Sequence, residues 1–255
     1  MDYRPVKSAE RTVRLLEVLA AAPTRLSLTE LQERMGYPRS SLYALVRTLR
    51  ELGWIEADST GTKFSIGPDA LRSGSAYLEH DPAIPFAART LEDLSNEVTH
   101  TVHYGRRDGA WVFYLATRES TETVRCAYRV GRKRPLYLTA LGQALLAELT
   151  TDELESIIPP KLEAVTSHTI VDRADLLAEL GTVRERGWAF EYEQGSPGVA
   201  CVAAAVDYRI PATDAISCSM PTAVADNPAE LDRISHRVLT HARRLGEHLR
   251  RAGIR

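Results

Sequence analysis

Residues 38 to 52 carry small, hydroxylic and basic side chains at spacings that would gather them on one side of a helix. Arg39, Ser41 and Tyr43 lie near its start, and Arg47 lies one turn further on. A helix that enters the major groove of DNA uses such a set, because small residues allow close approach, hydroxyls bind phosphates, and Arg or Tyr reach base edges. An ordinary amphipathic helix with a solvated polar face has the same pattern, so this stretch by itself leaves both interpretations open.

The residues before this stretch predict a second, shorter helix joined to it by a tight turn. Ser27 and Glu30 have the spacing of a capping box, in which each side chain binds the other residue's backbone N–H. Gly36 is suited to the left-handed conformation that ends a helix, and Pro38 to the first position of the next one. The apolar face of the second helix is predicted to be buried, and it consists of Leu42, Leu45, Val46, Leu49 and Leu52.

Two short β-strands are predicted directly after the second helix, at residues 54–57 and 63–66. The five residues between them include a glycine, which is typical of a hairpin loop. A hairpin in this position is the wing of a winged helix-turn-helix, and it favours DNA binding over the plain amphipathic helix. We therefore predict DNA contacts from Ser27, Thr29, Arg39, Ser40, Ser41, Tyr43, Arg47 and Lys63.

A second set of polar residues lies much later in the chain. Ser217 and Ser219 are two apart on a predicted strand and so share a face, with Cys201 and Glu191 on the two strands before it. Thr139 precedes a predicted helix whose first N–H groups would suit an anion. Together these groups would suit a small organic acid. Spacing alone favours the alternative that both serines face solvent on an edge strand while Cys201 packs in the core.

Other chemistries are disfavoured by the spacing of the residues that would carry them. The sequence has no glycine-rich nucleotide-binding motif, no HExxH and no GxSxG, and His100 and His103 would face opposite sides of a strand. The three cysteines are far apart and form no CxxC, so we expect no metal site, no cofactor and no disulfide framework. Two alternatives stay open: an enzyme with Cys201 as nucleophile, and a redox sensor that uses Cys201 or Cys218.

The composition is that of a globular protein large enough for two domains. The chain has 255 residues, of which 44% are hydrophobic and 26% are charged, with a net charge of −2. No apolar run reaches the length of a membrane span, and the N-terminus lacks a signal-peptide pattern, so we expect a cytoplasmic protein. Basic residues outnumber acidic ones only in the first part of the chain, which suits a DNA-binding module on an acidic body.

The remaining elements would position these side chains. A first helix is predicted at residues 7–21, with Val13, Leu16 and Leu19 inward and Leu15 and Val18 at its flanks. A connector with a short helix follows the wing.

Later helices are predicted at 81–97, 139–149, 152–157, 174–187 and 229–251. Strands are predicted at 99–104, 110–117, 122–130, 188–193, 199–207 and 214–220, a charged turn at 105–109 and a solvated Arg-rich loop at 131–134. Strands in two groups with helices between them predict an α+β fold with an antiparallel sheet.

Over nearly its whole length the sequence resembles the IclR family of bacterial transcription regulators. The matching stretches include LSLTELQERMGYPRSSLYALVRTLRELGWIE, GRKRPLYLTALGQALLAEL, GVACVAAAV and AISCSMP, in this order. The resemblance implies a winged helix-turn-helix at 5–67, a linker helix at 68–81 and a GAF-like α/β effector-binding domain at 82–255. It also implies a homodimer or homotetramer that binds a pseudo-palindromic double-stranded DNA operator and responds to a small-molecule effector, an organic or aromatic carboxylate.

The resemblance also implies where the effector binds. Family effector positions fall on Ala140, Leu141, Glu191, Cys201, Ser217 and Ser219, with apolar lining from Val124 and Cys126. Leu141 is bulkier than the residue common in the family, and Met220 stands where glycine is usual. These departures bear on which ligand binds more than on whether a site exists. The resulting prediction is a ligand-responsive DNA-binding regulator that is not an enzyme and has no membrane partner.

Overall fold

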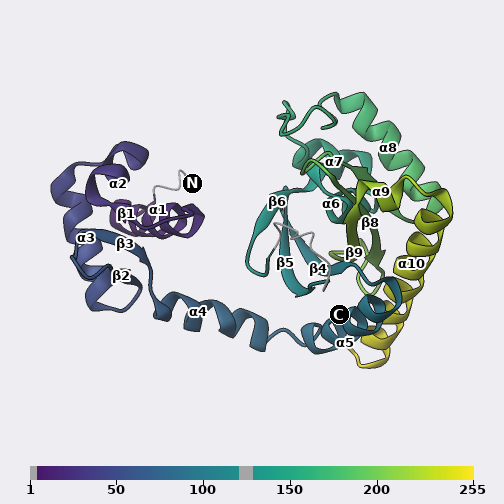
Figure 1. Ribbon diagram of the computed structural model, residues 1–255, viewed down its shortest axis with the longest axis horizontal. Helices are drawn as coiled ribbons and strands as arrows, with labels where there is room; N and C mark the ends of the chain where they lie inside the picture. The colour runs from purple at the N-terminus through teal and green to yellow at the C-terminus, as the bar shows by residue number, and fades with distance from the viewer. Residues whose placement is uncertain (1–4, 121–128) are drawn as a thin grey trace. The chain divides into compact units, whose positions relative to one another are not determined.

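The structure, a computed structural model, describes residues 5–120 and 129–255 and divides after His80 into two units (Figure 1). Unit 1 ends with His80 and unit 2 begins with Asp81. Both units combine helices with antiparallel strands, as the sequence predicted.

Unit 1 is a three-helix module with a small sheet, followed by a fourth helix, α4. Its elements are α1 (Lys7–Ala21), β1 (Leu26–Ser27), α2 (Leu28–Met35), α3 (Arg39–Glu51), β2 (Ile55–Ala57), β3 (Lys63–Ile66) and α4 (Pro68–Glu79). Leucines from the three helices meet in one core with residues of the wing, among them Leu15, Leu31, Leu42, Ile55 and Phe64. Burial of these side chains stabilises the module and orients α3, whose opposite face stays exposed.

Three details of unit 1 differ from the prediction. In α1 the fully buried residue is Leu15, whereas Val13 is 56% exposed. The apolar stripe of this helix is wide, so only tertiary packing determines which of its residues are buried. The two-residue strand β1 pairs with β3 and is too short to leave a pattern in the sequence. Leu52 is 60% exposed because α3 ends at Glu51 and Leu52 lies beyond its last turn.

Unit 2 is built on a six-stranded antiparallel sheet with the order β6-β5-β4-β9-β8-β7. The strands are β4 (Thr101–Asp108), β5 (Trp111–Arg118), β6 (Lys133–Pro135), β7 (Ala189–Tyr192), β8 (Val199–Val206) and β9 (Asp214–Pro221). The helices are α5 (Ile84–Val98), α6 (Ala140–Ala147), α7 (Thr151–Ile157), α8 (Arg173–Arg186), α9 (Thr222–Ala225) and α10 (Pro228–Arg251), with a 3₁₀ turn, η1 (Leu136–Leu138).

Helices cover both faces of this sheet. Helices α6 and α8 share a core with Ala189, Cys201 and Ala203 of β7 and β8. Helices α5 and α10 contact each other and the central strands (Figure 1). Residues alternate between the two faces along β8 and β9, and nearly all of them are buried, so these strands lie in the middle of a three-layer arrangement.

Two predictions in unit 2 are wrong. The charged turn expected at 105–109 is the second half of β4, and the turn follows at Gly109. Gly105 serves close packing instead, because a Cβ there would lie 2.9 Å from Cγ2 of Val112. The Arg-rich stretch is also more ordered than a solvated loop: Lys133 begins β6, and Nη2 of Arg134 donates to the carbonyl of Gly195 at 3.0 Å. Most of the strand expected at 122–130 lies outside the described residues.

The predicted start and end of the long helix α8 are confirmed. The carboxylate of Asp172 accepts the backbone N–H groups of Ala174 and Asp175 at 2.7 and 3.1 Å. Gly187 ends the helix with a φ of 81°, a left-handed conformation that glycine adopts without strain. Among the described residues no helix has both the length and the apolar character needed to cross a membrane.

Candidate functional sites

The exposed face of α3 carries most of the side chains predicted to contact DNA. Arg39, Ser40, Tyr43 and Arg47 are exposed, while Leu42, Val46 and Leu49 anchor the opposite face in the core. Nε of Arg47 donates to Glu51 at 3.1 Å, but both side chains are mostly exposed, so this pair adds little stability and leaves Arg47 able to turn to another partner. The orientation of α3 therefore presents its basic side outward.

Ser41 differs from its neighbours on α3 because it already has a protein partner. It is half-buried, and Nη1 of Arg11 on α1 donates to its hydroxyl at 3.3 Å. This contact joins the start of α3 to α1. Ser41 can still accept or donate one further hydrogen bond through its hydroxyl.

The start of α2 is the predicted capping box. The hydroxyl of Ser27 accepts the N–H of Glu30 at 3.3 Å, and the Glu30 carboxylate accepts the N–H of Ser27 at 2.7 Å. Hydrogen bonds from Ser27 also lower the pKa of Glu30. Ser27 is thus occupied in holding the helix start, whereas Thr29 in the first turn is exposed.

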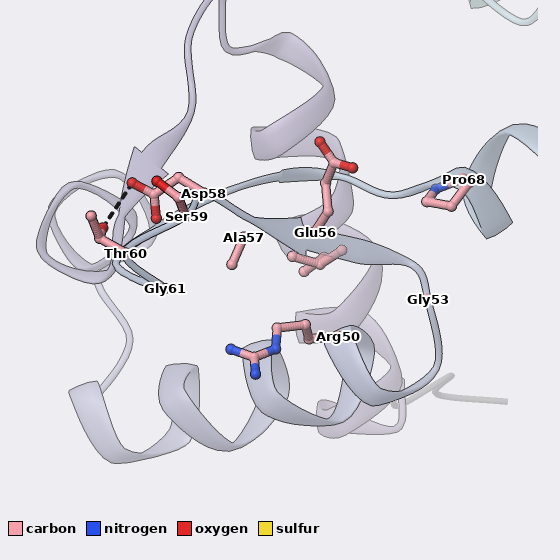
Figure 2. A pocket seen from close by; sticks show the side chains of 10 residues that line it. Arg50, Gly53, Glu56, Ala57, Asp58, Ser59, Thr60, Gly61 and Pro68 are labelled. Atoms are coloured by element: carbon pink, nitrogen blue, oxygen red, sulfur yellow. Dashed lines mark hydrogen bonds between the residues drawn. The ribbon is translucent and has the colours of Figure 1, made fainter.

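The wing loop between β2 and β3 is organised by one carboxylate. Oδ1 of Asp58 accepts the N–H groups of Thr62 and Lys63 at 2.9 and 3.1 Å. Its Oδ2 accepts the Thr60 hydroxyl at 2.9 Å, the hydrogen bond drawn in Figure 2. These hydrogen bonds lower the pKa of Asp58, and the one from the Lys63 N–H has the largest effect. The side chain of Lys63 is exposed at the end of this ordered loop, as a phosphate contact requires.

A hollow of about 600 Å³ lies between the end of α3 and the wing (Figure 2). Figure 2 shows the guanidinium of Arg50 extending into it below the wing strand, while the carboxylate of Glu56 points away on the other side of that strand. Glu56 instead pairs with Arg25 at 2.5 Å. Arg50 was not among the predicted contacts, although its place on the same helix face as Arg47 could have indicated it.

In unit 2 the strand register brings three of the predicted effector residues together in one row across the sheet. Glu191 of β7 lies opposite Cys201 of β8, which lies opposite Ser219 of β9, which lies opposite Thr101 of β4. All four are buried, with exposed fractions of 3% to 6%. Because β9 is a central strand and not an edge strand, the alternative that its serines face solvent is wrong.

The carboxyl group of Glu191 is the ionisable group of this row. Burial raises its pKa to about 7, an effect that the N–H of Gly195, donating to Oε1 at 2.8 Å, only partly offsets. Sγ of Cys201 lies 3.1 Å from Oγ of Ser219. Near neutral pH a large share of Glu191 is therefore protonated and able to donate a hydrogen bond.

A second row on the same face runs through Ser217. Ser217 is 2% exposed and lies opposite Ala203 on one side and His103 on the other. Nδ1 of His103 lies 3.0 Å from the hydroxyl of Thr117, and burial lowers the pKa of His103 to about 3, so its imidazole is neutral. Sequence reasoning missed Thr101 and His103, because only the pairing of distant strands puts them beside the serines. It also missed Thr117, which lies opposite His103 on β5.

Helix α6 packs over this polar face. Ala140 and Leu141 are almost fully buried at its start. The Thr139 hydroxyl accepts the N–H of Gly142 at 3.0 Å, so one of the N–H groups expected to suit an anion at this helix start is already bonded. Two further predicted residues, Val124 and Cys126, lie outside the described residues.

Gln143 is a polar residue that sequence reasoning missed in an otherwise apolar helix. Its Nε2 donates to the carbonyl of Tyr137 at 3.0 Å and to Oε1 of Gln194 at 2.8 Å. Its Oε1 is buried and has no hydrogen-bond partner among the described residues. A polar residue at this position in the apolar run ALGQALLA is itself a signal, because a buried amide needs partners.

Cys201 and Cys218 project to opposite faces of the sheet, because Cys218 is adjacent to Ser219, the residue that lies opposite Cys201. Both thiols are buried. Within residues 5–120 and 129–255 no group of three His, Cys, Asp or Glu residues is placed to hold a metal ion. The chemistry of the buried polar face is thus hydrogen bonding by hydroxyl, thiol, carboxyl and imidazole groups.

Two family models match successive parts of the chain. The model of the IclR helix-turn-helix domain matches residues 8–59, and that of the bacterial transcriptional regulator IclR C-terminal domain matches residues 75–247. The HTH-type transcriptional regulator BhcR of Paracoccus denitrificans (strain Pd 1222) is 31% identical over 246 residues, which are 96% of this chain and 88% of that protein.

Solved structures show the same fold. An IclR transcriptional regulator from Alicyclobacillus acidocaldarius is 24% identical, with a TM-score of 0.83 over 96% of this chain and 99% of that one. An IclR homolog from Microbacterium hydrocarbonoxydans, crystallised with 4-hydroxybenzoate, is 20% identical, with a TM-score of 0.73 over 92% and 99%. The relatives are transcriptional regulators and not enzymes. The chain belongs to the IclR family of DNA-binding bacterial transcriptional regulators.

Proposed function

We propose that this regulator reads a pseudo-palindromic double-stranded DNA operator with α3 and that a small organic or aromatic carboxylate, bound in unit 2, controls this binding. In this proposal residues 5–67 bind DNA, residues 68–81 connect, and residues 82–255 hold the effector. The observation that carries the DNA part is the orientation of α3, with its leucine side in the core and its arginine side exposed. A helix presented in this way can enter the major groove.

The proposed contacts divide by chemistry. Arg39, Tyr43 and Arg47 would reach base edges, because long polar side chains on the outer face of α3 are placed to do so. Phosphate contacts would come from hydroxyl and basic groups around them, namely Ser27, Thr29, Ser40, Ser41, Arg50 and Lys63. The base contacts would set specificity, and the phosphate contacts would set register and salt dependence.

A two-fold symmetric operator requires more than one copy of the chain, so the proposal includes a homodimer or homotetramer. Unit 1 exposes large apolar side chains, whose contact with water is unfavourable. Val13 on α1 is 56% exposed, and Leu71 and Tyr77 on α4 are 74% and 57% exposed. Exposed apolar side chains of this kind on two helices of one unit support self-association through unit 1.

The effector site is proposed on the polar face beneath α6. Ser217, Ser219 and Cys201 offer hydrogen bonds there, and Ala140 and Leu141 supply apolar contact. A partly protonated Glu191 can donate to a ligand carboxylate, whereas an ionised one would repel it. The 4-hydroxybenzoate bound to the homolog from Microbacterium hydrocarbonoxydans supports an aromatic carboxylate as the class.

The DNA proposal is tested by selecting duplexes from a random-sequence library with the full chain. We expect a two-fold symmetric site whose half-sites are spaced by about 10 base pairs or a multiple of this. Arg47→Ala should weaken binding to the selected duplex by about 1–3 kcal/mol if Arg47 contacts a base. Arg243→Ala, which removes an exposed arginine of α10, is the control and should change affinity less than twofold. Equal affinities for wild type and Arg47→Ala would remove Arg47 from the interface.

The effector proposal is tested by thermal unfolding with 4-hydroxybenzoate and a panel of other monocarboxylates. A ligand at about one hundred times its Kd adds about 2.7 kcal/mol to stability and so raises Tm. Ser217→Ala should reduce this shift. Ser235→Ala, which alters a buried serine of α10 that binds the carbonyl of Asp232, should leave it unchanged. A panel without any stabilising carboxylate would contradict the ligand class and leave the DNA proposal standing.

A further inference from the structure

A buried carboxylate in unit 2 gathers four donors on the face of the sheet that lies against α5 and α10. Asp214 at the start of β9 is fully buried. Its Oδ1 accepts the Tyr104 hydroxyl at 2.7 Å and Nε of Arg106 at 2.6 Å, and its Oδ2 accepts the hydroxyls of Tyr208 and Thr213 at 2.7 and 2.6 Å. Both oxygens of this buried carboxylate are therefore hydrogen-bonded.

Arg106 links this carboxylate to a second one. Its Nη1 donates to Oδ2 of Asp81, and its Nη2 lies 3.3 Å from the hydroxyls of both Tyr104 and Tyr208. The side chains of Arg106 and Asp81 are only 15% and 9% exposed. Every nitrogen of the guanidinium therefore has a partner, and the planar group is held in one orientation.

Asp81 stands at a special place in the chain. It is the first residue of unit 2 and follows α4 after a single residue, His80. Its other oxygen, Oδ1, accepts the N–H of the buried Ala83 at 2.9 Å, just before α5 begins. Asp81 is thus fixed at both carboxylate oxygens, by Arg106 of β4 and by the start of α5.

The two strands that hold this network also carry the polar face beneath α6. Along β4, Tyr104 and Arg106 alternate with Thr101 and His103, and along β9, Asp214 lies on the face opposite to Ser217 and Ser219. Arg106 and Asp214 are direct partners across these strands. A shift of β4 against β9 would therefore alter both the two rows of polar side chains beneath α6 and the hydrogen bond from Arg106 to Asp81.

We propose that Arg106 is a positioning residue that anchors the junction between α4 and unit 2 through Asp81, and that this anchor strengthens operator binding. The inference rests on the proposed DNA-binding function. In this proposal the anchor limits the backbone conformations open to the junction itself, so less conformational entropy is lost when two copies engage two half-sites. A released junction would weaken binding without removing any contact to DNA.

The test uses Asp81→Asn in the full chain, because removing Arg106 would leave the buried Asp214 with only the more distant Arg209, at 3.8 Å, as a cation and risk unfolding. The asparagine oxygen can still accept the Ala83 N–H, so the start of α5 is kept. Glu179→Gln is the matched control, since it removes another arginine–carboxylate pair of unit 2, to Arg186 at 2.8 Å, far along the chain from the junction. Both variants are first compared with the wild type by thermal unfolding.

The readouts are backbone hydrogen exchange over residues 77–87 and affinity for the duplex selected by the wild type. We expect Asp81→Asn to speed exchange in this segment about tenfold and to weaken binding about fivefold or more, with the slope of affinity against salt unchanged because phosphate contacts are kept. Glu179→Gln should change neither by more than twofold. Exchange or affinity equal to the wild type in Asp81→Asn overturns the inference, whereas a wild type that selects no duplex overturns the proposed function itself.

Discussion

The sulfur of Cys201 lies 3.1 Å from the hydroxyl oxygen of Ser219, across the β8–β9 pair and on the same face as Glu191. Cys201 is only 6% exposed, so its thiol is largely surrounded by protein atoms. A thiol in this setting acts as a weak hydrogen-bonding group within a polar row. Its reactivity toward oxidants is expected to be low, because the reactive form is an accessible thiolate.

Oxidation is therefore expected to leave DNA binding unchanged. Hydrogen peroxide at a concentration that oxidises an exposed thiol should alter operator affinity less than twofold, measured on the selected duplex before and after treatment. Cys201 and Cys218 face opposite sides of the sheet and cannot form a disulfide with each other without disrupting it. A loss of affinity in the wild type that Cys201→Ser abolishes would instead establish the redox-sensing alternative.

The raised pKa of Glu191 predicts a pH-dependent stability. Between pH 4.5 and about 7 the unfolded chain has Glu191 ionised while the folded chain keeps it protonated, so the folded state loses stability as pH rises through this window. The loss is on the order of 3 kcal/mol at most and is complete above pH 7. Urea unfolding at pH 5 and pH 8 should show Glu191→Gln gaining stability relative to the wild type at the higher pH. A difference that does not change with pH would show that Glu191 titrates normally.

The capping box at α2 predicts a stability loss on removing one hydroxyl. Ser27→Ala leaves the N–H of Glu30 without its acceptor and should cost about 1 kcal/mol of unfolding free energy. Thr29→Ala removes an exposed hydroxyl two residues on and serves as the control, with a change of about 0.5 kcal/mol or less. Chemical denaturation of both variants measures the difference. Equal losses in the two variants would contradict the role given to Ser27.

Two helical glycines are expected to respond in opposite ways to alanine. A Cβ at Gly142 of α6 would lie 2.0 Å from the carbonyl oxygen of Leu136, so Gly142→Ala must displace backbone and should be strongly destabilising. A Cβ at Gly74 of α4 meets no atom within 4 Å, so Gly74→Ala should stabilise by about 0.5–1 kcal/mol. Thermal unfolding of the two variants checks both signs. A tolerated Gly142→Ala would show that η1 and α6 are not packed this tightly.

Much of the architecture was predictable from the sequence because its signals are local. The capping pair Ser27 and Glu30, the helix-ending Gly187 and the leucine spacing of α3 each act within a few residues along the chain. Local hydrogen bonding and one-sided burial then suffice to indicate a helix and its orientation. The same reasoning failed at Val13 and Gly105, where a wide apolar stripe and a glycine in a strand have more than one local interpretation.

The sequence by itself predicted most of the order of helices and strands, the exposed basic side of α3 and the residue types available for a polar site. Only the tertiary structure decided which of these residues meet. His103 lies opposite Ser217, and Arg106 joins Asp214 to Asp81, because strands more than a hundred residues apart pair in one register. That register follows from burying both faces of the sheet at once, a condition set by the whole of unit 2 and by no single segment of it.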